Sequence, residues 1–519
     1  MRLELRSSLF GAIAIVIALV SAMRVGRYDF YGMIGLLVAL AVGLIAVSLR
    51  TPCVLAIPLR VGRISLATSV VLATVIGRIT LWSEWTIPVY LHGAVTAIIV
   101  VFLMRGRISR FADANPLLAL AALILPSTAA CWDGLAYAEG VTALVAWLPW
   151  LSSGLFATIG FAVTRPVEQL ERRTGMTLLV AMFILGGGIR IIGVVASPEP
   201  IIDVWSWRKE APHYLINGMN PYGADYPDVY ATERAKSYNL FDPMSTGSSR
   251  ELPTYPPLPI YLSAPFAAIG LDVRYADVCC DVLAAAMLYF AGWTMRNRPV
   301  GIIAAGIYLG FPLSARVVEQ SWYEPMLAAL FGAGLVLLKR GYRIGSFLVG
   351  LGLVGKQFGL MLAPSTALAC RRDRRSFAVG LGVAALLTIG VFLIWDAHWF
   401  LKIILFNHLG LKPRPDSLTL ASLIYQEWGS HISSKYLWMG MIVICGYIAW
   451  RTPNCPVVGA AWIGMSLFVF CLFNIQANFN YYYFCVYLLL MGIVALSTNR
   501  DAEPQIDSAR VRIASSVSR

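Results

Sequence analysis

Long apolar runs are the feature of this sequence that most limits its fold. They lie near residues 8–23, 31–49, 64–83, 86–104, 115–131, 141–163, 176–196, 256–271, 275–294, 298–316, 322–338, 344–369, 376–395, 435–450, 457–473 and 481–497. Because a helix needs about 20 apolar residues to cross a bilayer, this recurrence predicts an all-α polytopic membrane protein. Apolar residues make up 58% of the 519 positions and charged residues only 13%, which excludes a soluble globular domain, a disordered chain and a disulfide-stabilised scaffold.

The basic excess follows the connections between these runs. The chain carries 41 Lys and Arg residues against 28 Asp and Glu residues, a net charge of +13. Most of the basic residues fall in short connections such as 105–110, 164–175 and 371–375, which predicts that these connections and both termini face the cytoplasm. The sequence has no basic stripe with interleaved aromatic residues of the kind found in nucleic-acid binders. We therefore expect a lipid bilayer as a partner and no nucleic acid.

Two of the runs contain helix breakers and do not fit an ordinary span. The run 256–271 is rich in proline, and the run 344–369 is interrupted at Gly355-Lys356-Gln357 with Lys and Arg clusters at both ends. We expect the first to be an interfacial or re-entrant segment and the second to be two short helices in a hairpin, with Lys356 at the outer tip. The alternation of sides then places the polar stretches 197–274 and 396–434 outside.

Three regions follow from this arrangement. We expect residues 1–175 to form a six-span N-terminal extension, and residues 176–497 to form the main membrane core, whose large outer loop, 197–274, follows the seventh span. Residues 498–519 are polar and rich in Ser and Arg, which predicts a disordered cytoplasmic tail. The first apolar run resembles a signal peptide, but another run follows at once, so we expect an uncleaved anchor.

Polar residues of the outer loop are the first candidates for chemistry. Asp203 stands directly after an apolar run, among apolar and aromatic neighbours that remove water from its carboxylate, which suits a general base. The alternative is a salt bridge with Arg208 or Lys209. Asn220-Pro221-Tyr222 predicts a turn that presents the Tyr222 hydroxyl. Tyr255 precedes a stiff pair of prolines and is either a substrate contact or an ordinary interfacial aromatic residue.

Basic residues within the runs are the second group of candidates. Lys356, Arg316 and Arg190 lie in or at the ends of apolar runs, where ionisable groups are costly and usually have a partner or a function. Lys356 is the strongest case, because the neighbouring glycine allows a ligand to approach and an ammonium can bind a phosphate as a point charge. The alternative for Lys356 is an ion pair with Glu319 or Glu324.

Further polar groups complete the candidate set. Glu319-Gln320 closes one helix end and is expected to form part of a polar cluster at membrane depth. His408 lies in the third outer element and could act on a proton or a phosphate. None of the five histidines has a partner at the spacing typical of a metal site, and the nine cysteines lack such a spacing as well. We therefore expect no metal.

The ordered set of motifs resembles the GT-C superfamily of integral-membrane glycosyltransferases. It looks closest to the polyprenol-phosphate-mannose-dependent mannosyltransferases of bacteria, over about residues 176 to 497. The motifs that carry the resemblance are Asp203 after a span, Gly218-x-Asn220-Pro221-Tyr222, Tyr255-Pro256-Pro257-Leu258, Glu319-Gln320, and Lys356 in a broken helical hairpin.

The resemblance implies a reaction in which a polyprenyl-phosphate-linked sugar, mannose by this likeness, is the donor. The acceptor is a hydroxyl of a glycan, a glycolipid or another molecule on the extracytoplasmic side of the plasma membrane. Asp203 would deprotonate that hydroxyl, which attacks with inversion, while Lys356, helped by Arg316 or Arg190, stabilises the leaving phosphate. No cofactor or metal is required. The resemblance also implies substrate contacts from Asn220, Tyr222, Tyr255, Glu319, Gln320 and His408.

Two alternatives stand beside this reading of the sequence. If the catalytic core began at residue 1, Asp29 would be the base, although its loop is short and lacks the Asn-Pro-Tyr and Tyr-Pro-Pro motifs. A transporter or flippase of lipid-linked substrates, or a lipid-linked glycan polymerase or ligase, would share much of the pattern. We favour the glycosyltransferase because the charged residues within the runs lie toward the outer face, and the internal repeats typical of transporters are not visible.

Overall fold

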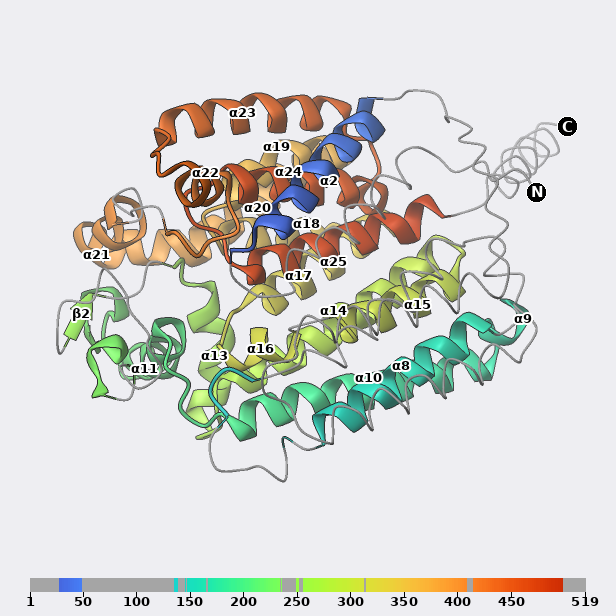
Figure 1. The fold of residues 1–519 in the computed structure, drawn as a ribbon, viewed down its shortest axis with the longest axis horizontal. Helices are drawn as coiled ribbons and strands as arrows, with labels where there is room; N and C mark the ends of the chain where they lie inside the picture. Colours follow the sequence, from blue (N-terminus) through green and yellow to red (C-terminus); the bar gives the residue numbers. More distant parts are fainter. Residues whose placement is uncertain are drawn as a thin grey trace, which may run out of the picture.

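Helices dominate the computed structural model of the protein (Figure 1). The structure describes residues 28–48, 135–138, 145, 147–164, 167–233, 235, 249–251, 255–311, 314–407 and 414–497. Strands within these ranges are limited to one short antiparallel pair, β1 (Asp225–Pro227) and β2 (Ser249–Glu251). The expected all-α membrane fold is confirmed. The runs predicted near 8–23, 64–83, 86–104 and 115–131, and the predicted tail 498–519, lie outside the described residues.

Five helical stretches of the described part are long and apolar enough to cross a membrane. They are α10 (Arg173–Ala196), α14 (Arg274–Thr294), the stretch Arg371–Phe406, α24 (Pro456–Phe473) and α25 (Phe479–Leu496). The 36-residue stretch is made of η3 (Arg371–Asp373), α20 (Arg374–Ala385), η4 (Leu386–Gly390), α21 (Val391–Leu401) and η5 (Lys402–Asn407). Apolar runs of the predicted length are therefore helices in the folded chain.

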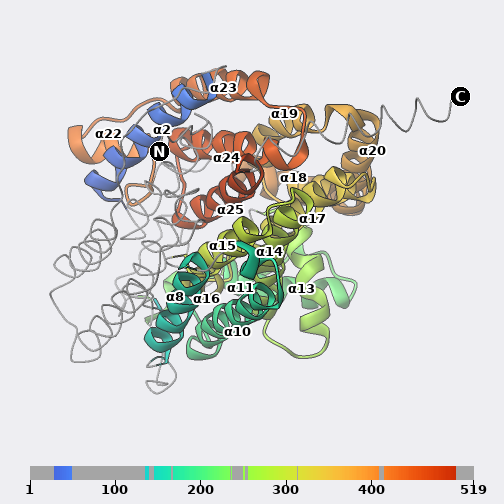
Figure 2. The ribbon, with the colours of Figure 1, turned by 90° about the vertical axis from the view of Figure 1, so that its right-hand side faces the viewer.

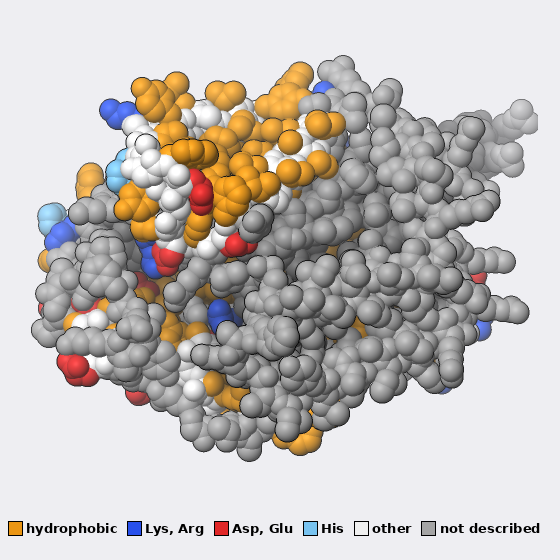
Figure 3. Space-filling model, viewed as in Figure 1, with side chains coloured by type: hydrophobic (Ala, Val, Ile, Leu, Met, Phe, Trp, Pro, Cys, Tyr) orange, Lys and Arg blue, Asp and Glu red, His pale blue; other side chains and the backbone are white. Residues whose placement is uncertain are grey.

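Further helices fill the spaces between these five and cover their sides. They are α2 (Phe30–Ser48), α8 (Leu148–Thr164), α9 (Val167–Leu170), α15 (Arg298–Leu309), α16 (Ser314–Glu319), α17 (Glu324–Lys339), α22 (Leu420–Trp428) and α23 (Ser434–Arg451). In both ribbon views α8 and α10 form one side of the bundle and α23 the other, with α14, α17 and α25 between them (Figures 1 and 2). Apolar side chains gather over α2 and α23, as expected of a surface that faces lipid (Figure 3).

Both apolar runs with helix breakers are interrupted as predicted. The proline-rich run 256–271 contains only the 11-residue helix α13 (Leu258–Ala268), which is too short to span a bilayer. The run 344–369 divides into α18 (Ile344–Val354) and α19 (Gly359–Ala369), with Lys356 in the break. The break requires a glycine at position 359, because a Cβ there would lie 1.7 Å from the main-chain oxygen of Leu353.

Two expected segments differ in the structure. The run 298–316 is not one helix, because α15 ends at Leu309 before Gly310 and Pro312, which favour a helix stop. The stretch 396–434 is not one continuous loop, since helical residues resume after a kink at Asp396 and continue through η5, and α22 forms a further helix. Asp396 has a φ of −158° and a ψ of 88°, which are not helical, so the kink lies directly after the predicted end of the run at residue 395.

The described part of the loop 197–274, which the sequence predicts to lie outside, contains regular structure. It contains α11 (Asp203–Ile216), the short 3₁₀ helices η1 (Pro221–Gly223) and η2 (Val229–Ala231), and the strand pair. In Figure 1 α11, β2, α13 and α21 gather at one end of the bundle, where α10 ends. This end holds the polar residues singled out from the sequence.

The N-terminal helix α2 packs against the second half of the chain. The Tyr28 N–H donates to the Asp416 main-chain oxygen at 2.9 Å, and the Tyr28 hydroxyl donates to Glu427 at 2.7 Å. Asp29, the alternative base, accepts a hydrogen bond of 2.9 Å from the Gly32 N–H, an N-terminal capping contact. The division of the chain at residue 175 stays a prediction.

Close approach of α14 and α15 depends on two glycines. A Cβ added at Gly292 would lie 2.7 Å from the Gly301 Cα, whereas a Cβ added at Gly446 in α23 would meet nothing within 4 Å. Small residues at such crossings allow membrane helices to pack backbone against backbone.

We predict that Gly292→Ala lowers the melting temperature of the detergent-solubilised protein, because overpacking costs about 1–3 kcal/mol. Gly446→Ala is the matched control and should leave the melting temperature unchanged or raise it, since alanine favours helix by about 1 kcal/mol. Equal melting temperatures for the two variants would contradict the close packing of α14 against α15.

Candidate active site

Asp203 is the first residue of α11 and lies just beyond the end of α10. Its side chain is half-buried, and the Tyr230 hydroxyl donates to Oδ1 at 3.5 Å. The positive end of a helix dipole is a favourable place for a carboxylate. Burial raises the pKa of Tyr230, and the charge of Asp203 raises it further, so the phenol stays protonated and can donate to Asp203. Asp203 therefore lies near the start of the loop 197–274, and its role as the base stays a prediction.

Asn220 and Tyr222 shape the loop through contacts with the protein. The Asn220 side chain accepts the Tyr222 N–H at 3.0 Å and caps η1. The Tyr222 hydroxyl donates to the Tyr255 main-chain oxygen at 2.9 Å, and its buried ring contacts Phe392 and Phe400 edge-on at 4.9 Å each. The Tyr222 hydroxyl is therefore engaged in fixing the backbone at Tyr255.

Lys356 occupies the break between α18 and α19 and is 4% exposed. Its ammonium pairs with Glu324, which confirms one of the two ion-pair alternatives. Aromatic rings surround the same ammonium, with the centroids of Tyr481 at 4.1 Å and Tyr323 at 4.7 Å. Such rings attract a cation through their negative faces.

Tyr255 connects the surroundings of Asp203 with those of Lys356. Its half-buried ring lies 5.5 Å from the Lys356 ammonium and contacts Tyr323 at 5.5 Å. Burial raises the pKa of Tyr255, and the charges of Asp203 and Glu324 both raise it further. The charges of Asp203 and Glu324 thus both act on the Tyr255 phenol, so Asp203 and the Lys356–Glu324 pair lie around the same tyrosine.

Arg190 is completely buried in the bundle and bound by protein groups. Its guanidinium pairs with Asp281 and donates to the main-chain oxygens of Gly186 and Leu309 at 2.9 and 3.0 Å. A further donor lies 3.2 Å from the Tyr483 hydroxyl. A phosphate contact at Arg190 would therefore require disruption of a buried ion pair.

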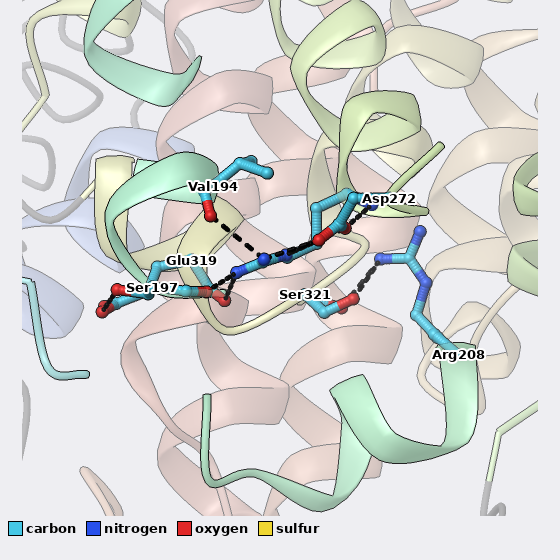
Figure 4. A network of polar contacts seen from close by, with 7 residues as sticks. Val194, Ser197, Arg208, Asp272, Glu319 and Ser321 are labelled. Atoms are coloured by element: carbon cyan, nitrogen blue, oxygen red, sulfur yellow. Dashed lines mark hydrogen bonds and ion pairs between the residues drawn. The ribbon is translucent and has the colours of Figure 1, made fainter. Parts of the chain in front are cut away.

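Glu319 belongs to a polar network at the outer end of α10 (Figure 4). Its carboxylate accepts the Ser197 hydroxyl at 2.7 Å and the main-chain N–H groups of Ala136 and Tyr137 at 2.8 and 2.7 Å. Gln320, the next residue, is 8% exposed. The half-buried Arg316 interacts with the charge of Glu319. These contacts join α16 to the start of the outer loop.

Arg274 is the centre of this network and was not singled out from the sequence. Its guanidinium donates to the main-chain oxygens of Val194, Ser197 and Glu319 at 3.1, 2.7 and 3.1 Å, and to the Asp272 carboxylate at 2.6 Å. The residue is 0% exposed. A basic residue at the start of an amphipathic membrane helix was its only signal in the sequence.

Arg208 fixes α11 on the core in a similar way. It donates to Asp277 at 2.5 Å, to the Ser263 hydroxyl at 2.8 Å and to the Ser321 main-chain oxygen at 2.8 Å. The sequence offered Arg208 as a partner of Asp203, and the structure pairs it with Asp277.

Arg414 is a basic group near Asp203 that the candidate set lacked. It forms hydrogen bonds of 3.2 and 3.1 Å to Asp416, and its side chain is 35% exposed. Burial opposes its charged form, but the bond to Asp416 and the charges of Asp416 and Asp203 outweigh burial and raise the pKa of Arg414. Asp416 follows Arg414 closely in the sequence, but only the fold brings Arg414 toward Asp203.

His408 lies outside the described residues, so its predicted role stays a prediction. Among the residues that the structure describes, no group of three or more His, Cys, Asp or Glu side chains is arranged to hold a metal ion. Asp203, Tyr255 and Lys356 are brought together, whereas Arg190 and Glu319 lie in separate buried networks.

We predict that Arg190→Leu destabilises the protein by about 3–5 kcal/mol, because it leaves Asp281 buried without its cation. The melting temperature measures this effect, and Arg190→Leu combined with Asp281→Leu should recover part of the loss. A donor KM that rises with no change in melting temperature would instead assign Arg190 to phosphate binding.

Comparison with known proteins adds one match. The sequence model of Glycosyltransferase family 87 matches residues 254–472, a stretch that includes Tyr255, Glu324 and Lys356 and begins after Asp203. No curated protein and no solved structure matches the chain. The match over residues 254–472 therefore indicates a membrane glycosyltransferase, similar to the GT-C-type enzymes of Glycosyltransferase family 87.

Proposed function

We propose that the protein transfers a sugar from a polyprenyl-phosphate donor to an acceptor hydroxyl, with Asp203 as the general base. The observation that carries the proposal is the position of Asp203 at the start of α11, next to Tyr255 and the Lys356–Glu324 pair. A carboxylate next to an aromatic-lined pocket can take a proton from a hydroxyl held there. The family match favours this enzyme over a transporter or flippase.

In the proposed reaction each bond change has a place in the site. The Asp203 carboxylate takes the proton of the acceptor hydroxyl, and the hydroxyl oxygen forms a bond to the anomeric carbon. The bond from that carbon to the phosphate oxygen breaks on the opposite face, so the configuration inverts and polyprenyl phosphate leaves with the electron pair. Cationic groups at the leaving oxygen stabilise its developing charge.

Lys356 is the best placed of the predicted phosphate contacts, because it borders the ring of Tyr255. Arg316 is half-buried at the outer end of α16, beside Glu319 and Gln320. Arg190 is fully buried in its pair with Asp281, so its contribution would be indirect. We propose Tyr255 as a wall of the substrate site, with Asn220 and Tyr222 holding its backbone in place.

The membrane orientation belongs to the same proposal. Basic connections favour cytoplasmic termini, which puts the loop 197–274 and Asp203 on the extracytoplasmic side of the plasma membrane. A lipid-linked donor would then present its phosphate at the outer leaflet, beside α13, whose 11 residues suit an interfacial position. The resemblance to mannosyltransferases favours mannose as the sugar.

We predict that Asp203→Asn lowers sugar transfer by about 100- to 10,000-fold, the range typical of a lost general base. Transfer is measured in vitro with a panel of polyprenyl-phosphate sugars, which also identifies the sugar. Asp29→Asn is the matched control and should retain activity, because Asp29 caps α2. Full activity of Asp203→Asn with a dead Asp29→Asn would move the base to Asp29.

A further inference from the structure

A buried polar cluster lies where α17, α25 and the break after α18 meet. Glu324 begins α17 and is 0% exposed, and its Oε1 accepts from both Lys356 and the Asn480 amide, the latter at 2.8 Å. Tyr323 precedes Glu324, is 1% exposed and places its ring beside Lys356. Four polar side chains from three distant parts of the chain therefore converge inside the protein.

Three polar atoms of this cluster have no hydrogen-bond partner in the part of the chain that the structure describes. They are Glu324 Oε2, Asn480 Oδ1 and the Tyr323 hydroxyl. A buried polar atom without a partner costs about 1–3 kcal/mol, so native proteins rarely keep such atoms unpaired. The convergence of three of them beside one ammonium points to a ligand that supplies hydrogen-bond donors.

The chemistry of the free atoms restricts the ligand. A carboxylate oxygen and an amide oxygen only accept hydrogen bonds, and a phenol accepts or donates. The Lys356–Glu324 pair has no net charge, and a phosphate next to Glu324 Oε2 would meet a like charge. Neutral hydroxyl groups satisfy these atoms, because each hydroxyl brings one donor and also accepts.

The surroundings fit a sugar ring. The half-buried rings of Tyr481 and Tyr255 lie 4.1 and 5.5 Å from the Lys356 ammonium, and they offer apolar faces next to the polar cluster. A sugar has hydroxyls at its edge and C–H groups on its faces, so both surfaces find a partner here. Tyr255 also neighbours Asp203, which places the cluster on the side of the candidate base.

We propose that Glu324, Asn480 and Tyr323 form the sugar subsite of the donor and bind its hydroxyls. The proposal rests on the proposed function, and it divides the cluster into two parts. The remaining donors of Lys356 serve the phosphate, and the oxygens of the other three residues hold the adjoining ring. Residues of the family 87 region and of the following helix α25 therefore build the subsite together.

Tyr323→Phe tests the proposal because it removes one buried oxygen and nothing else. If the hydroxyl is only structural, its loss costs nothing, since the atom has no partner in the described structure. If it binds the sugar, kcat/KM for polyprenyl-phosphate mannose should fall by about 3- to 10-fold, while the melting temperature of the free protein stays unchanged or rises. Tyr487→Phe is the matched control, because its buried hydroxyl also lacks a partner but its ring contacts Tyr308.

Monodeoxy analogues of the donor sugar identify the bond. The wild type and Tyr487→Phe should discriminate against the analogue that lacks the bound hydroxyl, and Tyr323→Phe should lose that discrimination. Equal kinetics of the two Phe variants would overturn the proposal. An equal fall for every analogue in Tyr323→Phe would also overturn it. Donor binding to Asp203→Asn, measured by thermal shift, separates a failed subsite from a wrong choice of base.

Discussion

The guanidinium of Arg274 makes the contacts on which the position of the candidate active site depends. It bonds to the main-chain oxygens of Val194 and Ser197 at the end of α10 and of Glu319 at the end of α16. These oxygens lie at helix ends, where carbonyl groups lack intrahelical partners. One buried cation therefore fixes the point at which the chain leaves the bundle, six residues before Asp203 in the sequence.

Buried arginines paired with carboxylates recur through the described core, and they contribute geometry more than stability. Arg208 with Asp277 holds α11, and Arg190 with Asp281 joins α10 to α14. Removal of two charges from water costs several kcal/mol, and a good pair roughly offsets that cost. What such a pair provides is one fixed arrangement, because any other packing leaves a charge buried alone. Asp203 and the aromatic residues around Lys356 are thereby held in one arrangement.

Lys356 shows how a membrane site can combine charge with an apolar setting. Its pairing with Glu324 removes the net charge, and the rings of Tyr323 and Tyr481 cover the ammonium. Both the helix break that contains this lysine and the glycine that permits the break were visible in the sequence. The sequence left two possible partners for Lys356, Glu319 and Glu324, because both lie in the same polar stretch. Only the packing of the helices decides between them.

The sequence by itself determined the membrane class and the break at Lys356, and it singled out Asp203 and Lys356 as candidates. Hydrophobic length, glycine and proline act locally, so their effects can be read from neighbouring residues. Only the tertiary structure decided that Glu319 binds Ser197 and main-chain N–H groups, that Arg190 pairs with Asp281, and that Arg414 lies near Asp203. These partners come from distant segments, such as Ala136 and Glu319 at a separation of 183 residues, and no local pattern chooses among equally charged residues. Burial makes that choice, because each charge must end beside a group that satisfies it.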